Sequence, residues 1–198
     1  MTLIEVLVAV VVLAFGVLAA ATLQLTSKRN NGDAGARSLA AQLGYDILQR
    51  MRMNRSTDAL STYLQNAASG IGRGQQGPEP APNCTSSTCS RTQVADHDLW
   101  VFEQQLDGNF ETLTAGSTTA SVGGFVNPTA CVSGPAGGVS GTYTVTIVWK
   151  SNREVPDNSG VTCGSAAVDG SGNRLYGSND EFRRSVTTQG YITNWSLP

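Results

Sequence analysis

The sequence predicts an α+β protein in which a long N-terminal helix, with a membrane-inserting half and an amphipathic half, packs on an antiparallel β-sheet head. Three observations lead to this prediction. An uncharged apolar run occupies residues 6–23, apolar residues recur at helical spacing over 39–51, and the clearest strand pattern lies at 142–150. An antiparallel sheet packed on the second half of the helix is the simplest arrangement that buries both apolar faces.

The apolar run is long enough to cross a membrane. At about 1.5 Å per residue it spans roughly 27 Å as a helix, close to the roughly 30 Å hydrocarbon core of a bilayer. A cleavable signal peptide would begin with basic residues, but the first basic residue is Lys28. A buried core helix could be equally apolar, but it would rarely begin a chain. We therefore expect residues 1–27 to form a membrane and polymerisation helix.

Glu5 is the only charged residue between Thr2 and Ser27. A charged side chain inside a membrane segment costs roughly 2.5–3.5 kcal/mol on insertion scales and is rare without a partner. The position of Glu5 near the start of the chain suggests an α-amino group as that partner, in this chain or in a neighbouring copy. The alternative is that the Glu5 carboxylate reaches the membrane interface and has no such partner.

The helix is predicted to continue as an amphipathic segment over residues 28–55, which gives one helix over 2–54 of about 80 Å. Residues 30–35 contain two asparagines and two glycines. Because glycine costs about 0.8–1.0 kcal/mol relative to alanine in a helix interior, we interpret these residues as a weak point rather than the end of the helix. The apolar residues that define the amphipathic face are Leu39, Leu43, Ile47, Leu48 and Met51.

Residues 56–198 are predicted to form a globular head. Its two helices are expected after the long helix, with Thr92 as the N-cap of the second, and its three strands are expected nearer the C-terminus. A loop rich in Gly and Pro at 69–90 separates the two helices. The predicted helices are 57–68 and 92–106, and the predicted strands are 122–133, 142–150 and 182–193.

The head contains four cysteines, which allow three disulfide connectivities. We favour Cys84–Cys89 and Cys131–Cys163, because each pair closes a local loop or joins neighbouring elements. A zinc site is the rival interpretation. It is disfavoured because the spacings are not Cys-x-x-Cys and because His97 is the only histidine. Disulfides indicate that the head lies outside the cytoplasm.

The charge distribution changes sign along the chain. Residues 24–55 carry a net charge of +4 and residues 56–198 a net charge of −5, within an overall charge of −2. This balance does not suggest a nucleic acid as partner. Lys28 and Arg29, just after the apolar run, would place the head in the cytoplasm by the positive-inside rule. The cysteines favour the opposite orientation, and we give them more weight.

We predict no catalytic residues, no metal site and no cofactor. The sequence has no GxSxG, HExxH or P-loop motif. His97 lies between two aspartates on a predicted helix, and we interpret it as a solvated residue rather than a catalytic base. The DGSGN segment at 169–173 is similar to the start of a calcium loop, but Arg174 replaces the required glycine. We interpret this segment as a turn.

The segment MTLIEVLVAVVVLAFGVLAAATLQ resembles the mature N-terminus of type IV pilins and pseudopilins. Met1, Thr2, Leu3 and Glu5 match the family pattern in register. The resemblance implies a type IV pilin fold, in which a prepilin peptidase removes a leader and Met1 becomes the processed, N-methylated terminus. It also implies an assembly role for Met1 and Glu5. Thr22 departs from the pattern, because many major pilins have a proline there that loosens the helix.

Within the family, the chain is most like minor pilins of the PilV type. This resemblance is carried by the apolar segment with Gly16 and by DHDLW at 96–100, TYTVTIVWK at 142–150 and RRSVTT at 183–188. It implies a subunit that joins a priming complex at the pilus tip and serves twitching motility and adhesion. The implied partners are other minor pilins, the major pilin, a PilY-type tip adhesin and the inner-membrane assembly platform.

The resemblance also implies a location. The subunit would be held in the inner membrane as a single-pass protein with its head in the periplasm, and would move to the pilus tip on assembly. Two alternatives remain open at this point. One is a minor pseudopilin of a type II secretion system, and the other is a membrane-anchored ligand-binding or hydrolytic domain.

Overall fold

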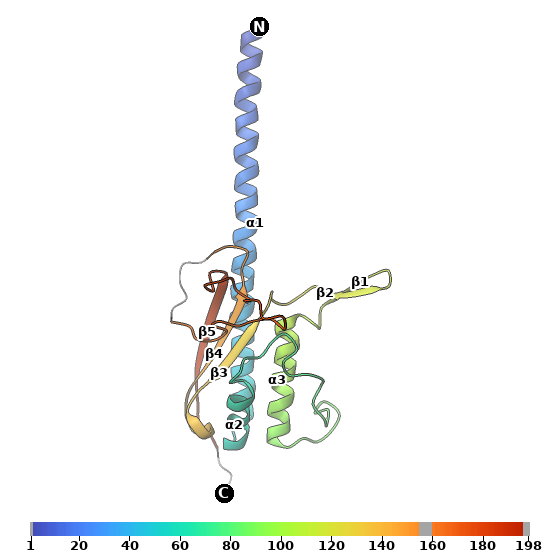
Figure 1. The fold of residues 1–198 in the computed structure, drawn as a ribbon, viewed down its shortest axis with the longest axis vertical. Helices are drawn as coiled ribbons and strands as arrows, with labels where there is room; N and C mark the ends of the chain where they lie inside the picture. The colour runs from blue at the N-terminus through green and yellow to red at the C-terminus, as the bar shows by residue number, and fades with distance from the viewer. Residues whose placement is uncertain (1, 155–159, 196–198) are drawn as a thin grey trace. The chain divides into compact units, whose positions relative to one another are not determined.

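A computed structural model describes residues 2–154 and 160–195, and within them it has the predicted α+β architecture (Figure 1). By its contacts the chain forms two compact units, Met1–Ser38 and Leu39–Pro198, which we describe separately. The functional division at residues 27 and 55 stays a prediction. The elements in chain order are α1 (Leu3–Met53), α2 (Thr57–Asn66), α3 (Arg91–Asp107), β1 (Thr112–Ala115), β2 (Thr118–Ser121), β3 (Thr129–Ser133), the 3₁₀ helix η1 (Ala136–Gly138), β4 (Gly141–Lys150) and β5 (Arg183–Ile192).

Helix α1 is one uninterrupted helix over Leu3–Met53, which confirms the prediction to within one residue at each end. It continues through residues 30–35, so the weak point does not end it. Added side chains at Gly32 and Gly35 would meet nothing within 4 Å. These glycines therefore do not make room for a close neighbour, and their effect on the helix is limited to their low intrinsic propensity.

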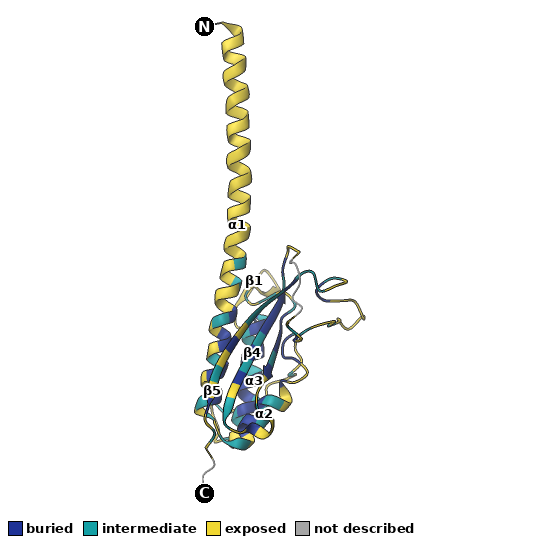
Figure 2. Cartoon of the chain, turned by 90° about the vertical axis from the view of Figure 1, so that its left-hand side faces the viewer, coloured by how far each residue is buried: buried dark blue, intermediate teal, exposed yellow. Residues whose placement is uncertain are grey.

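The second half of α1 supplies one wall of the head's core. Its buried residues follow helical spacing and include most of the predicted apolar face (Figure 2). Leu39 remains exposed. Gly44 lies against β5, because a Cβ atom there would stand only 2.7 Å from Oγ1 of Thr188. The buried residues of α1 are Ala40, Leu43, Gly44, Ile47, Leu48 and Met51.

The head's main sheet is antiparallel, in the order β3-β4-β5. The central strand β4 matches the prediction at 142–150, and its alternate residues Tyr143, Val145 and Ile147 are buried on one face. Val148 is buried on the other face, where it packs with Cys163, Leu175 and Tyr176. The loop between β4 and β5 therefore covers part of the sheet's second face. As a result, β4 is buried on both faces at this point, rather than exposed to solvent on one of them.

The two edge strands differ in how well they were predicted. Strand β5 agrees with the predicted 182–193 to within one residue at each end. Strand β3 is much shorter than the predicted 122–133, because residues 122–128 are not strand. Within β3, the backbone of Ala130 also pairs with Ile71 from the loop after α2.

The start of α3 corrects the sequence analysis. The N-cap is Ser90 rather than Thr92, and the helix begins at Arg91. The Ser90 hydroxyl accepts the N–H of Gln93 at 3.2 Å, and the Gln93 side chain accepts the N–H of Ser90 at 2.8 Å. This reciprocal capping box satisfies two backbone donors that would otherwise lack partners, whereas a cap at Thr92 would satisfy fewer.

A hairpin formed by β1 and β2 was not predicted. Its two strands pair over four residues on each side and are exposed along their whole length. The sequence lacks the apolar alternation that marks a half-buried strand, because Thr, Ser and Ala supply most of its residues. Its one local signal is the two-residue link Gly116-Ser117, a pair typical of tight hairpin turns, which the sequence analysis missed.

Candidate assembly interface

The first half of α1 exposes an apolar surface. Fourteen large apolar side chains from Leu3 to Leu25 are between 49% and 81% exposed. The most apolar 18-residue window of α1 has a mean hydropathy of 2.8 and none of it is buried, so by length and composition this helix could cross a membrane. A helix in a soluble core would be mostly buried. The exposed surface fits a segment that is covered by lipid or by other helices.

Glu5 lies in the first turn of α1. Its Oε2 atom accepts the backbone N–H of Thr2 at 3.4 Å. A carboxylate at this end of a helix interacts favourably with the helix dipole and with unpaired first-turn amides. Met1 lies outside the described residues, so the predicted pairing between its amine and Glu5 stays a prediction.

Helix α1 remains a regular helix at Thr22, the position where many major pilins carry proline. The Thr22 hydroxyl donates to the carbonyl of Ala19 at 2.8 Å, and the Thr26 hydroxyl donates to the carbonyl of Thr22 at 3.0 Å. Threonine also keeps the backbone N–H that proline lacks. The departure at Thr22 therefore leaves the hydrogen-bonded helix intact around this residue.

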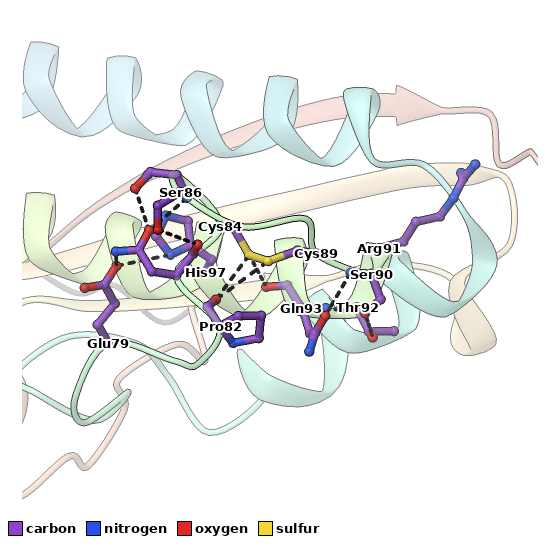
Figure 3. The surroundings of a disulfide bond; sticks show 12 residues. Glu79, Pro82, Cys84, Ser86, Cys89, Ser90, Arg91, Thr92, Gln93 and His97 are labelled. Atoms are coloured by element: carbon purple, nitrogen blue, oxygen red, sulfur yellow. Dashed lines mark hydrogen bonds and ion pairs between the residues drawn. A yellow bond between two sulfur atoms is a disulfide. The ribbon is translucent and has the colours of Figure 1, made fainter.

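The head is held by two disulfides with the pairing that we expected. Cys84–Cys89 closes a short loop beside the start of α3, and Figure 3 shows it next to Pro82, Gln93 and the Ser90 cap. Cys131–Cys163 joins β3 to the loop between β4 and β5, across a sequence separation of 32 residues. The second bridge ties the loop that covers the sheet to an edge strand. By the chain-entropy model it contributes about 3–4 kcal/mol, against about 2 kcal/mol for the shorter loop.

The interpretation of His97 as a solvated residue was wrong. Its side chain is buried, and its Nδ1 atom lies 3.8 Å from Oε1 of Glu79 (Figure 3). Its ring also stacks on Trp100. The flanking aspartates suggested exposure, but the loop that carries Glu79 covers this turn of α3. His97 is therefore a buried residue of α3 that faces a carboxylate from the loop before this helix.

The DGSGN segment forms a turn, as predicted. The Asp169 carboxylate accepts the N–H groups of Ser171 and Asn173 at 2.9 and 2.8 Å. These hydrogen bonds lower the pKa of Asp169, and the bond from Asn173 has the largest effect. Among the residues that the structure describes, no group of three or more His, Cys, Asp or Glu side chains is placed to hold a metal ion.

A buried polar network that sequence analysis missed joins the three helices. Asp98 on α3 accepts from Nη1 of Arg50 on α1 at 3.0 Å and from the hydroxyl of Tyr63 on α2 at 2.5 Å. Arg50 also binds Asp46 at 2.9 Å. Burial, followed by the charge of Asp98, raises the pKa of the Tyr63 phenol. Only the tertiary fold brings these residues together, and their spacing in the sequence gives no signal of it.

Comparison with known families gives an independent observation. Residues 22–100 match the family model Tt1218-like, described as type IV pilin Tt1218. This match supports the type IV pilin family. It begins near the end of the apolar run and extends into α3, so it includes neither Glu5 nor the β-sheet. The support it gives is therefore separate from that of the N-terminal motif. No curated protein and no solved structure matches the chain.

The fold is compatible with this match. A long N-terminal helix with antiparallel sheets is consistent with the type IV pilin fold. The pilin family is structural rather than enzymatic, and it implies association with other components of a pilus. The exposed apolar half of α1 fits a pilin that is first anchored in a membrane and later part of a pilus.

Proposed function

We propose that this chain is a PilV-type minor pilin that joins the priming complex at the tip of a type IV pilus. The observation that carries the proposal is the first half of α1, an exposed apolar helix with Glu5 as its single charge. The resemblance of residues 1–24 to mature pilins and the family match over residues 22–100 support it from separate parts of the chain.

The apolar helix must stay away from water at every stage of this proposal. Fully burying one large apolar side chain is worth about 1.5–3 kcal/mol, and fourteen such side chains are roughly half to four-fifths exposed. Together they represent on the order of 20 kcal/mol relative to water. The helix must therefore stay covered, first by lipid in the inner membrane and then by the helices of neighbouring pilins.

Glu5 sets the register of that packing. An unpaired charge buried among helices costs several kcal/mol, so a register that pairs Glu5 with the processed, N-methylated amine of Met1 is strongly preferred over one that does not. The amine belongs to the same subunit or to a neighbour. The contact between Glu5 and the N–H of Thr2 supports this arrangement, because it turns the carboxylate toward the start of the chain.

The remaining parts of the proposal follow from the resemblance. A prepilin peptidase generates Met1, the inner-membrane assembly platform extracts the subunit, and the head faces the periplasm before assembly. Other minor pilins, the major pilin and a PilY-type tip adhesin are the partners, with twitching motility and adhesion as the outcomes. The disulfides support a head outside the cytoplasm.

The substitution Glu5→Ala tests the assembly role. We expect normal or slightly higher membrane levels, since a charge is removed from the apolar segment, together with fewer pili. The matched control is Asp33→Ala, which removes an acid from the same helix outside the apolar run. Pili are counted by electron microscopy, and membrane levels are measured by immunoblot. Normal piliation with normal incorporation of the Glu5→Ala subunit would refute the role of this carboxylate.

Affinity purification from native cells distinguishes the pilus from a secretion system. The subunit is tagged at the head, crosslinked and purified from detergent-solubilised membranes. We expect minor pilins and a tip adhesin among the crosslinked partners. We also expect the tagged subunit to be far less abundant in the cells than the major pilin. Recovery of type II secretion pseudopilins in their place would move the chain to that system.

A further inference from the structure

A basic pocket lies in the head where α1 ends and α3 begins. It has a volume of about 750 Å³ and is open to solvent, within the range of ligand-binding clefts. Four arginines and two aspartates line it, for a net charge of +2, although residues 56–198 carry a net charge of −5. The charged lining residues are Asp46, Arg50, Arg52, Arg55, Arg91 and Asp98.

The two aspartates are already occupied. Arg50 binds Oδ2 of Asp46 at 2.9 Å and Oδ1 of Asp98 at 3.0 Å, which satisfies both acids with one guanidinium. The other three arginines form no ion pair with any residue in 2–154 or 160–195. Arg50 and the two aspartates together carry a net charge of −1, and the other three guanidinium groups bring the pocket to its net charge of +2.

Helix electrostatics explain only part of this excess. Arg52 lies in the last turn of α1, where a cation interacts favourably with the helix dipole. Arg91 is the first residue of α3, where the same dipole makes a cation unfavourable by about 0.3–1 kcal/mol. Figure 3 shows its side chain extending away from the Cys84–Cys89 disulfide. Helix electrostatics therefore account for Arg52 but not for Arg91.

Trp195 holds one guanidinium in place. The Arg55 guanidinium lies 5.7 Å from the centroid of the indole ring. The backbone N–H of Trp195 also donates to the backbone carbonyl of Arg55 at 3.0 Å. Met53 and Val94 add apolar surface to the same pocket. The lining thus combines fixed cations with apolar side chains, which suits a peptide better than a simple inorganic anion.

We propose that this pocket binds a segment of a partner protein that carries two or more clustered carboxylates. Guanidinium groups can bind carboxylates through two parallel hydrogen bonds. In this pocket Arg50 already binds the carboxylates of Asp46 and Asp98. A nucleic acid fits less well, because residues 56–198 carry a net charge of −5 and would repel the phosphates that extend beyond the pocket. The proposal does not depend on a position at the pilus tip.

The test uses the full chain in nonionic detergent micelles and a fluorescein-labelled hexapeptide with four Asp and Glu residues. Its Asn and Gln counterpart is the peptide control. The pocket variant is Arg52→Gln, Arg55→Gln and Arg91→Gln combined. The matched control variant is Lys28→Gln, Arg29→Gln and Arg37→Gln combined, which removes the same charge from the exposed part of α1.

We expect the acidic peptide to bind, with affinity that falls as salt rises, and the neutral peptide not to bind. The pocket variant should bind about tenfold more weakly, because two or more charge-assisted contacts are lost, while the control variant changes by less than about twofold. Absence of peptide binding, or equal losses in both variants, would overturn the proposal. Tighter binding of a twelve-nucleotide oligothymidylate, weakened by the pocket variant, would replace it with a nucleic-acid site.

A single variant keeps the test valid if the triple variant is unstable. Arg91→Gln changes one exposed residue at the start of α3 and should not lower the melting temperature, because it removes an unfavourable cation from that end of the helix. We expect peptide binding to weaken about threefold. Unchanged binding by a folded Arg91→Gln chain would contradict the part assigned to this residue.

Discussion

Removal of the Asp98 carboxylate tests whether the polar network between the helices holds the head together. Asp98 is the acceptor shared by Arg50 on α1 and Tyr63 on α2, and its own helix is α3. The Tyr63 side chain is fully buried, and the side chain of Arg50 is 28% exposed. Asp98→Ala therefore affects the two partners unequally.

The magnitude follows from this difference in burial. The Tyr63 hydroxyl loses its acceptor away from water, which costs about 1–3 kcal/mol. Arg50 keeps Asp46 and partial access to water, so its loss adds about 1 kcal/mol or less. We expect Asp98→Ala to lower the free energy of unfolding of the head by about 2–4 kcal/mol. Asp46→Ala, whose side chain is 43% exposed, should cost below about 1 kcal/mol.

The assay is urea unfolding of the head followed by circular dichroism, with equal m-values as the check on two-state behaviour. Tyr63→Phe in the Asp98→Ala background should be nearly neutral, because the orphaned hydroxyl is removed with it. The two substitutions should thus be less than additive by about 1–2 kcal/mol. Equal costs for Asp98→Ala and Asp46→Ala would refute the assignment of the network's energy to the buried phenol.

Three further predictions concern the head. Because the pKa of Tyr63 is raised on folding, its phenol stays neutral in the folded state while it ionises near pH 10 in the unfolded chain; stability should therefore fall as pH rises above about 10, and less steeply in Tyr63→Phe. Replacing Cys131 and Cys163 by serine should lower stability by about 3–4 kcal/mol, and peptide mapping without reductant should recover both disulfides of the unaltered protein. A fragment of residues 28–198 should be a folded monomer whose circular dichroism shows helix and strand, and a molten or insoluble product would contradict this.

Local patterns were sufficient for the parts of the fold that repeat one signal many times. The long helix, the central strand at 142–150 and the disulfide pairing all follow from periodicity or sequence distance. The hairpin β1–β2 could not be found in this way, because it buries nothing and so leaves no apolar alternation. Its existence depends on paired backbone groups and on turn geometry around Gly116, whose φ is 64°.

The candidate sites also differ in whether a local sequence pattern marks them. Glu5 stands out in the sequence because it is one charge in an apolar run. Asp98 and His97 gave misleading signals, since adjacent acids in a DHD segment suggest a solvated helix face, yet both side chains are buried. Their burial is produced by α1, α2 and the loop that carries Glu79, all distant in sequence. The arginine pocket is likewise assembled from α1, α3 and the segment near Trp195.

The distribution of burial along α1 separates assembly from folding. The buried residues of this helix begin at Ala40, so the apolar residues before it add nothing to the core of the head. Substitutions between Leu3 and Leu25 should therefore change insertion and polymerisation without changing the unfolding of the head. Substitutions of buried residues such as Ile47 should do the reverse, at about 2–5 kcal/mol for Ile→Ala. The proposed assembly role requires this separation, because the helix would exchange lipid for neighbouring helices while the head remains folded.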